Sequence, residues 1–390
     1  MHQRILIVGA SIAGLTVAHW LDRYGFRTTV VERATSLRTG GNGVDLREGA
    51  VEVADRMGIL PDARAAGTDV RGMRFVDAAD RTIGQVGIGE PGSVELMRGD
   101  LVDLLHRAGG SGIEYIFGDA VRDLAQDDSG VTVSFEHAPD RRFDLVIGAD
   151  GLHSTVRALA FGPHREFVRH RDHYFAFADT GVAAGENRWM TMYNLPGKMV
   201  GVYRSGNHAQ AKAYFIFRSA PLDYDHRDVD EHRRLVARAF AAETSWWIPD
   251  LLAEALADPE FYFDALSQVH MKSWSSGRVA LVGDAAWCAS PASGAGAELA
   301  MVGGYRLAGE LAAAGGDHLA AFARYHDGHR VLVDSKQRIG PNLRLMVPRT
   351  VRGRWLRDAA ARLPLLRAAS AVERWVRARV PALPEYLPAR

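Results

Sequence analysis

The order of apolar and polar positions along the chain predicts alternating strands and helices. Residues 4–8 form a short apolar and β-branched run, which is typical of a strand that is buried on both faces. Residues 15–24 have the spacing of a helix, and Gly25 is a residue that commonly ends one. Three further apolar runs predict buried strands at residues 26–31, 143–150 and 277–284. The pattern therefore indicates an α/β fold around a parallel sheet.

A different pattern occupies residues 171–270. Its runs are rich in aromatic and β-branched residues, and turn-forming segments separate them. This pattern is typical of antiparallel strands. The runs lie at residues 173–177, 188–193, 199–203 and 213–217. We therefore expect an antiparallel β-sheet domain inserted into the α/β domain.

The length of 390 residues favours two or three domains. We expect a discontinuous α/β domain made of residues 1–75, 98–170 and 271–345. Residues 76–97 and 171–270 would form the inserted β-sheet domain. In the remaining segment, residues 346–390, arginines alternate with apolar residues, which favours a helical segment that packs on the protein.

Composition and charge exclude several classes of protein. Basic and acidic residues balance at 47 each, so the sequence lacks the basic excess of a nucleic-acid-binding protein. The single cysteine, Cys288, excludes a disulfide framework, a zinc finger and an iron–sulfur cluster. No apolar run is long enough to span a membrane. We expect a cytoplasmic monomer or homodimer that holds no metal and binds neither nucleic acid nor a membrane.

The first strand leads into a glycine turn that is typical of dinucleotide binding. Gly9 permits a tight turn, and Gly14 lets the following helix lie close to the strand. Ser11 stands where the usual pattern has its middle glycine. Glu32 follows Gly14 by 18 residues and ends the second strand, where a carboxylate can accept a hydrogen bond from a ribose hydroxyl. The amino end of the helix would bind a pyrophosphate.

Two more acidic residues follow apolar strands. Asp150 ends the run at 143–150, and Asp284 ends the run at 277–284. Ligands of open α/β sheets bind at the carboxyl ends of the strands. A helix rich in small residues begins near Gly294, so its amino end could stabilise an anion at the same edge.

The ordered set of these motifs resembles the class A, single-component FAD-dependent monooxygenases, the family of para-hydroxybenzoate hydroxylase and of many aromatic-polyketide hydroxylases. Four blocks carry the resemblance: residues 9–32, 98–101, 150–157 and 283–296. The resemblance implies a Rossmann-like FAD-binding domain of the GR2 type, an inserted substrate domain and a C-terminal helical segment.

The resemblance also implies the roles of single residues. The expected contacts with FAD involve Gly9, Ser11, Ile12, Ala13, Gly14, Glu32, Arg33, Gly43, Arg98, Asp150, Asp284, Gly294, Ala295, Gly296 and Ala297. Among these, Glu32 would hold the adenosine ribose, and the turn at 294–297 would face the pyrimidine end of the isoalloxazine. Asp150 would lie near both FAD and a transient NAD(P)H. Trp287 and Glu298 depart from the pattern of the family.

The substrate is expected between the flavin and the β-sheet domain. Aromatic and apolar side chains there would suit a planar hydrophobic molecule, although strand alternation allows only about half of them to face one side. The candidates are Met192, Tyr203, Tyr214, Phe215 and Pro291.

The family's chemistry resides in the flavin, so no side chain is assigned as catalytic. The resemblance implies that NAD(P)H reduces FAD, that O2 adds to form a C4a-hydroperoxide, and that one oxygen atom enters an aromatic or polyketide-like substrate. The product would arise by hydroxylation or Baeyer–Villiger oxidation. No second glycine-turn unit exists for the nicotinamide cofactor. Two alternatives remain: a cyclase or pericyclase that keeps FAD as a scaffold, and a ligand-binding protein with an empty nucleotide site.

Overall fold

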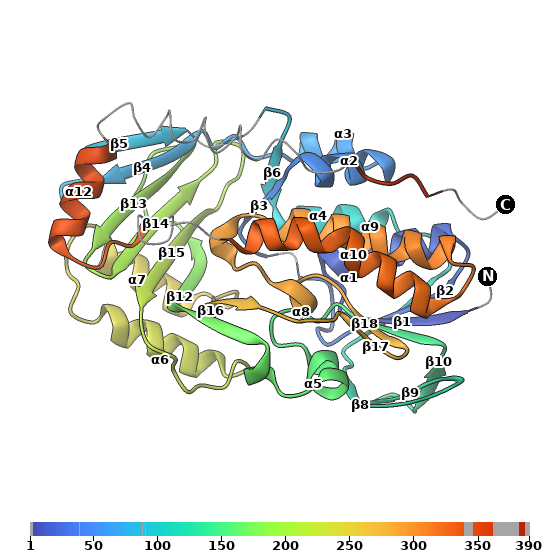
Figure 1. Ribbon diagram of the computed structural model, residues 1–390. Helices are drawn as coiled ribbons and strands as arrows, with labels where there is room; N and C mark the ends of the chain where they lie inside the picture. Colours follow the sequence, from blue (N-terminus) through green and yellow to red (C-terminus); the bar gives the residue numbers. More distant parts are fainter. Residues whose placement is uncertain are drawn as a thin grey trace.

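The computed structural model describes residues 3–38, 40–87, 89, 91–338, 346–361 and 382–386. Two large sheets lie beside one another, and helices cover them (Figure 1). The first sheet has six strands in the order β17-β18-β11-β1-β2-β7. The neighbours are parallel except for β17 and β18. The strands are β1 (Arg4–Val8), β2 (Arg27–Glu32), β7 (Ile113–Phe117), β11 (Leu145–Gly148), β17 (Ser275–Ser276) and β18 (Val279–Leu281).

Helices pack on this sheet and form the larger hydrophobic core with it. Helix α1 (Ile12–Arg23) packs against α9 (Gly296–Ala313) and α4 (Arg98–Arg107), and α10 (His318–Gln337) lies against α9. The shorter helices of this part are α2 (Glu48–Arg56), α3 (Leu60–Ala65), α5 (Thr155–Phe161), η1 (His164–Glu166), α8 (Asp284–Trp287) and η2 (Pro291–Ser293). Buried apolar residues of β1, α1 and α9 meet in a single cluster, because each element turns its apolar side to the others.

Two small sheets complete the α/β part. A three-stranded sheet contains β8 (Val121–Asp127), β9 (Gly130–Phe135) and β10 (Arg141–Phe143). The strands β3 (Gly43–Leu46) and β6 (Val94–Met97) form an antiparallel ribbon. The ribbon lies between the two large sheets, so it can carry residues to the boundary of both (Figure 1).

The second large sheet has seven strands in the order β16-β12-β15-β14-β13-β4-β5. Its neighbours are antiparallel except for β13 and β4, which are parallel. The strands are β4 (Gly72–Val76), β5 (Thr82–Gly87), β12 (Val168–Thr180), β13 (Trp189–Leu195), β14 (Lys198–Arg204), β15 (Ala211–Arg218) and β16 (Tyr262–Val269). Apolar residues of α6 (Val229–Phe240) and α7 (Ile248–Ala257) cover one face. The other face holds a separate cluster with Phe177 and Met192.

One helix of the C-terminal segment is described, α12 (Val351–Ala361), and it lies at the end of the seven-stranded sheet (Figure 1). The Arg357 Nη2 atom donates to Asn194 Oδ1 at 2.8 Å, and the guanidinium lies over the ring of Phe75 at 4.2 Å. The rest of the expected helical segment, residues 362–381 and 387–390, falls outside the described residues. Within the described part of the chain, no helix is both long and apolar enough to span a bilayer.

The predicted α/β fold with an inserted β-sheet domain is confirmed. The first strand occupies the predicted residues, and the four aromatic runs form β12 to β15. The expected boundary at residue 75 cuts through β4, which belongs to the seven-stranded sheet, whereas β6 pairs with β3. The inserted sheet is also not wholly antiparallel, because β4 reaches it from an early part of the chain and lies parallel to β13.

Candidate functional site

The turn between β1 and α1 is shaped by two glycines. Gly9 has a φ of +109°, and a Cβ there would lie 2.6 Å from the carbonyl oxygen of Ala149. A Cβ on Gly14 would overlap the carbonyl oxygen of Gly9. Side chains are therefore excluded where the helix crosses the strand.

The amino end of α1 has no side-chain cap. Ser11 is the residue before the first turn, and its hydroxyl makes no capping hydrogen bond. Instead, Ser11 Oγ accepts a hydrogen bond from Arg98 Nη2 at 2.7 Å. The first backbone N–H groups, at Ile12 and Ala13, thus lack a side-chain acceptor, as a site for a phosphate group requires.

Glu32 lies beside this turn at the carboxyl end of β2. Its carboxylate accepts hydrogen bonds from the backbone N–H groups of Ala10 at 2.8 Å and of Ala34 at 2.9 Å. Two backbone donors fix the side chain, and a carboxylate can accept further hydrogen bonds. Arg33 follows Glu32 directly, just beyond the strand.

Asp284 lies at the same edge of the sheet, as the first residue of α8, which follows β18. Its side chain is exposed, while its neighbours Gly283 and Ala285 are buried. Even so, the surrounding protein removes enough water to raise the pKa of Asp284, and nearby Arg98 opposes this effect. Burial in turn lowers the pKa of Arg98. A carboxylate that is open on one side and otherwise surrounded by protein fits a ligand groove.

The turn before α9 faces open space. Gly294 and Gly296 are exposed, whereas Ala295 between them and Ala297 after them are buried. A Cβ on Gly296 would meet no atom within 4 Å. The amino end of α9 therefore presents backbone to a space that a ligand could fill.

The β3–β6 ribbon approaches this turn from the other side. A Cβ on Gly294 would lie 3.3 Å from Arg47 Nη2, and the same guanidinium contacts Asp45 at 2.6 Å. Gly43, at the start of β3, donates its N–H to the hydroxyl oxygen of Tyr214. The ribbon thus joins the turn at α9 to the seven-stranded sheet.

Asp150 has a second set of partners. Its carboxylate accepts hydrogen bonds from Ser154 Oγ at 2.5 Å and from the backbone N–H of Val156 at 3.0 Å. Burial raises its pKa, and these hydrogen bonds oppose the shift. The residue therefore holds the beginning of α5, and Gly151 beside it, with a φ of +79°, borders open space.

The structure separates the predicted substrate residues. Met192 and Tyr214 belong to the cluster on the face toward the ribbon, and Tyr203 Oη donates to Thr68 Oγ1 at 2.9 Å on that side. Pro291 is exposed in η2, just before the turn of α9. Phe215 lies on the opposite face, 5.3 Å from Phe240 of α6 between ring centroids. Alternation along β15 turns it away from the groove, so it does not join the other four.

Two residues that the sequence did not suggest also lie here. Tyr262 of β16 stacks on Phe177 at 4.8 Å between ring centroids. Burial, followed by the charge of Asp264, raises the pKa of Tyr262, and the nearby charge of Arg98 opposes this shift while that of Asp284 adds to it. Glu95 lies on β6, and Thr68 Oγ1 donates to its Oε2 atom at 3.1 Å. Burial, followed by the charge of Asp45, raises the pKa of Glu95 to about 7. The sequence signal that could have identified Glu95 is its place as an isolated acid between the apolar residues Val94 and Leu96.

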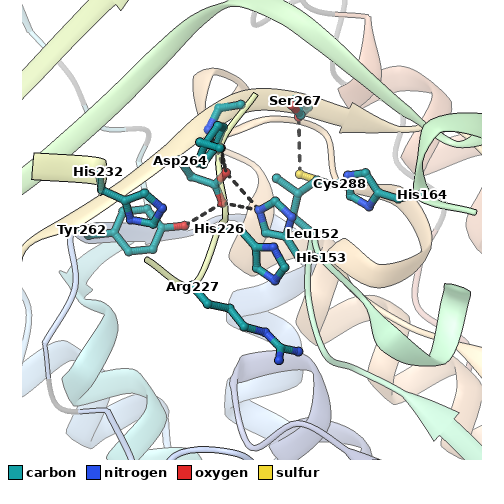
Figure 2. A network of polar contacts seen from close by, with 12 residues as sticks. Leu152, His153, His164, His226, Arg227, His232, Tyr262, Asp264, Ser267 and Cys288 are labelled. Carbon is teal, nitrogen blue, oxygen red and sulfur yellow. Dashed lines mark hydrogen bonds and ion pairs between the residues drawn. The ribbon is translucent and has the colours of Figure 1, made fainter. Parts of the chain in front are cut away.

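A polar network links the loop after Asp150 to β16 of the seven-stranded sheet (Figure 2). His153 Nε2 lies 3.1 Å from both carboxylate oxygens of Asp264 on β16. The His153 ring stacks on His226 at 4.3 Å and on His164 at 5.4 Å between centroids. Burial lowers the pKa of His164 to about 4, so its ring is neutral at pH 7. The stack fixes the loop after Asp150 against the second sheet.

Cys288 lies in the same network and is buried. Its Sγ atom lies 3.5 Å from the carbonyl oxygen of Ser267 and within reach of Asp284. Burial raises the pKa of the thiol well above its usual range, which makes a reactive thiolate unfavourable. Among the described residues, no group of three or more histidine, cysteine or acidic side chains could hold a metal ion.

The fold and this edge define an α/β dinucleotide-binding protein with a second domain over the carboxyl ends of its parallel strands. The sequence profile of the FAD binding domain family matches residues 2–325, and the chain belongs to this family. It is an FAD-dependent monooxygenase, a flavoprotein of the class that the sequence resembles.

Similar proteins carry the same description. A flavin-dependent monooxygenase from an unknown prokaryotic organism is 38% identical over 87% of this chain and 88% of its own length. A flavin-dependent monooxygenase of Legionella longbeachae is 35% identical over 86% of this chain and 87% of its own length. A FAD-dependent monooxygenase of Sarocladium schorii is 31% identical over 79% and 75%, respectively.

Solved structures agree over the whole length. The crystal structure of tetracycline destructase Tet(51) has a TM-score of 0.84 and 33% identity, and it covers 99% of this chain and 100% of its own. Tetracycline destructase Tet(55) has a TM-score of 0.82 and 35% identity, with 99% of each chain covered. Klebsiella pneumoniae HpxO with FAD and uric acid, at 22% identity and a TM-score of 0.70 over 95% of this chain and 96% of its own, shows the common fold.

Proposed function

We propose that this flavoprotein uses NAD(P)H and O2 to insert one oxygen atom into an aromatic or polyketide-like molecule, by hydroxylation or Baeyer–Villiger oxidation. Bound FAD would supply the electron transfer and the oxygen chemistry. The observation that carries the proposal is the aromatic face of the seven-stranded sheet, where Phe177, Tyr214 and Tyr262 lie together beside the groove edge. Such a face suits a flat, apolar ring system.

The residues at the groove edge fit FAD. The uncapped amino end of α1 and Arg98 would bind the pyrophosphate, and Glu32 would accept from the adenosine ribose. Asp284 would accept a hydrogen bond from the ribityl chain, and the open turn at 294–297 would face the isoalloxazine. Gly43 would lie beside the ring. These assignments follow from which backbone and side-chain groups remain open to the groove.

The substrate would lie over the aromatic face, in contact with Tyr214 and near Tyr203, Met192 and Pro291. The relatives named tetracycline destructases support the inclusion of tetracyclines among the compounds tested. The cyclase alternative is not favoured, because the prokaryotic, Legionella longbeachae and Sarocladium schorii relatives are all named as monooxygenases.

The experiment is reduction of the purified flavoprotein without oxygen, by NADH and by NADPH, with a panel of phenols and tetracyclines. A true substrate should accelerate bleaching of the flavin, and admission of O2 should then yield a product that is heavier by one oxygen atom. A flavin that neither nicotinamide reduces, with any compound of the panel, would contradict the proposed function.

The proposed cofactor site is tested by Asp284→Ala, which should lose bound FAD and keep the fold. The matched control is Asp144→Ala, because Asp144 precedes β11 at the opposite edge of the same sheet, where its carboxylate accepts from the N–H of Arg4. The measurement is the ratio of flavin to protein absorbance after gel filtration, with circular dichroism for the fold. Full flavin content in Asp284→Ala would contradict the assigned role.

A further inference from the structure

An ion pair between a fully buried acid and a mostly buried lysine lies directly behind the turn at the amino end of α9. Glu298 is the third residue of this helix, and its relative exposure is 0%. Its Oε2 atom lies 2.7 Å from Nζ of Lys336, in the last turn of α10. Lys336 is one of only four lysines in the chain. The position of Glu298 is also one where the sequence departs from the pattern of the family.

Stability alone does not account for such a pair. Removing two charges from water costs several kcal/mol for each ion, and apolar replacements of buried pairs are often neutral or stabilising. The helix ends recover part of this cost, because an acid in a first turn and a base in a last turn both interact favourably with the helix dipole. A pair that is retained despite its desolvation is a candidate for an electrostatic role.

The location of the Glu298–Lys336 pair indicates what this electrostatic role is. Glu298 lies two residues beyond Gly296, at which a Cβ would meet only open space. The other charges that face the Glu298 carboxylate are Arg47 and Glu48, at the beginning of α2. The Arg47 guanidinium reaches the same turn at Gly294. Charge at this end of α9 is therefore contributed by a small, defined set of side chains.

We propose that the Glu298–Lys336 pair sets the electrostatic balance between oxidised and reduced flavin at the turn before α9. The inference rests on the proposed function, which places the pyrimidine end of the flavin at this turn. Reduction by two electrons with uptake of one proton adds one negative charge to the flavin. Ionised Glu298 opposes that charge, Lys336 favours it, and the partial positive charge of the helix end adds to the effect of Lys336.

The first variant is Glu298→Gln, which keeps the shape of the side chain and removes its negative charge. Reduced flavin should then bind about tenfold more tightly relative to oxidised flavin, which for a two-electron couple is an increase of about 30 mV in the midpoint potential. The second variant, Glu298→Gln with Lys336→Met, removes both charges. In this double variant, the ratio of the affinities for reduced and oxidised flavin should return to within about threefold of the wild-type ratio.

A matched control exists on the same two helices. Arg324 of α10 contacts Glu310 of α9 at 2.6 Å, near the opposite end of α9. Glu310→Gln removes a negative charge between the same helices, far along α9 from the turn. It should leave the midpoint potential unchanged. The potential is measured by reduction against a reference dye, and the affinity for oxidised FAD by quenching of its fluorescence.

The outcomes separate the two proposals. A chain that takes up no FAD contradicts the proposed function. A chain that binds FAD normally, but in which Glu298→Gln has the potential of the wild type or of Glu310→Gln, overturns the role of the pair alone. If Glu298→Gln does not fold, the double variant is the test. The proposal predicts a wild-type midpoint potential for it, and a change of tenfold or more in the relative affinity for reduced and oxidised flavin would contradict the proposal.

Discussion

Single residues at the boundary between the ribbon and the seven-stranded sheet carry the least expected chemistry of this protein. Glu95 illustrates this point, because its carboxyl group lies among Thr68, Tyr203 and Gly43. A Cβ on Gly43 would lie 2.8 Å from Glu95 Oε1, so any larger residue there would force the carboxyl group to move. The arrangement favours a protonated acid at the edge of the aromatic face.

We predict that Glu95→Gln makes stability less dependent on pH. The pKa of Glu95 rises from 4.5 to about 7 on folding, chiefly through burial. The unfolded chain thus releases this proton at lower pH than the folded chain, and stability falls as the pH rises from about 4.5 to 7. Glutamine keeps the hydrogen-bond acceptor and cannot ionise. Above pH 7 the variant should be more stable than the wild type, on the order of 2–3 kcal/mol.

The measurement is urea unfolding of both proteins at pH 5 and at pH 8. A difference that grows toward pH 8 is expected. Parallel changes in the two proteins would show that Glu95 ionises normally in the folded state.

At the residue scale, the sequence predicted best where local backbone geometry dictates the residue type. Gly9 and Gly14 could be identified because a side chain would collide with nearby backbone. The orientation of Phe215 could not be identified, because the choice of face depends on which helices cover the sheet. Glu95 was missed for a related reason: its neighbours come from distant parts of the chain, at Thr68 and Tyr203.

The helices α1 and α9 differ in how much space surrounds their amino ends. Helix α1 crosses β1 so closely that the first turn tolerates only glycine at position 14, whereas the first residue of α9 borders open space. The two helix ends therefore differ in their steric surroundings: backbone crowds the first turn of α1, whereas no atom lies close to the first residue of α9. This contrast predicts different effects when alanine replaces glycine at the two positions.

Alanine substitutions at Gly296 and at Gly14 should have opposite effects on the fold. Gly296→Ala should leave the unfolding free energy of the FAD-free chain unchanged or raise it by up to about 1 kcal/mol, because alanine is the better helix former. It should nevertheless weaken FAD binding, since the methyl group enters the proposed site. Gly14→Ala should destabilise the chain itself, because its Cβ would overlap the carbonyl oxygen of Gly9.

Thermal unfolding without FAD and FAD titration of each variant separate these effects. If Gly296→Ala bound FAD with wild-type affinity, the flavin could not lie at the turn before α9.

Element boundaries show where prediction from a local pattern stops. Strands β12 to β15 were recognisable from their own aromatic and β-branched residues. The expected boundary at residue 75 falls within β4, because the partner of this strand, β13, lies more than a hundred residues later in the chain. The same boundaries place residues 94–97 in the β-sheet domain, whereas these residues form β6, which pairs with β3. Pairing between distant segments depends on the whole fold and leaves little trace in a local window.

In the described part of the chain, residues of the two large sheets come together near the carboxyl ends of the parallel strands. The charges of Arg98 and Asp284, which belong to the α/β part, act on Tyr262 of β16 in the seven-stranded sheet. The contact between His153 and Asp264 joins the same two parts. A ligand at this boundary would contact both parts at once, so its binding energy should stabilise both.

We predict that FAD slows hydrogen exchange in both large sheets together. A ligand that binds only the folded chain stabilises it by about 2.7 kcal/mol at a concentration 100 times its dissociation constant. Because Tyr262 lies near Arg98 and Asp284 of the proposed FAD site, amides of β16 (Tyr262–Val269) should gain protection along with those of β1 (Arg4–Val8). The measurement is exchange followed by mass spectrometry, with and without FAD. Asp284→Ala at the same FAD concentration serves as the control and should gain little protection in either sheet. Protection confined to β1 and its neighbours would mean that the flavin contacts the α/β part alone, and the placement of the substrate over the aromatic face would then lose its support.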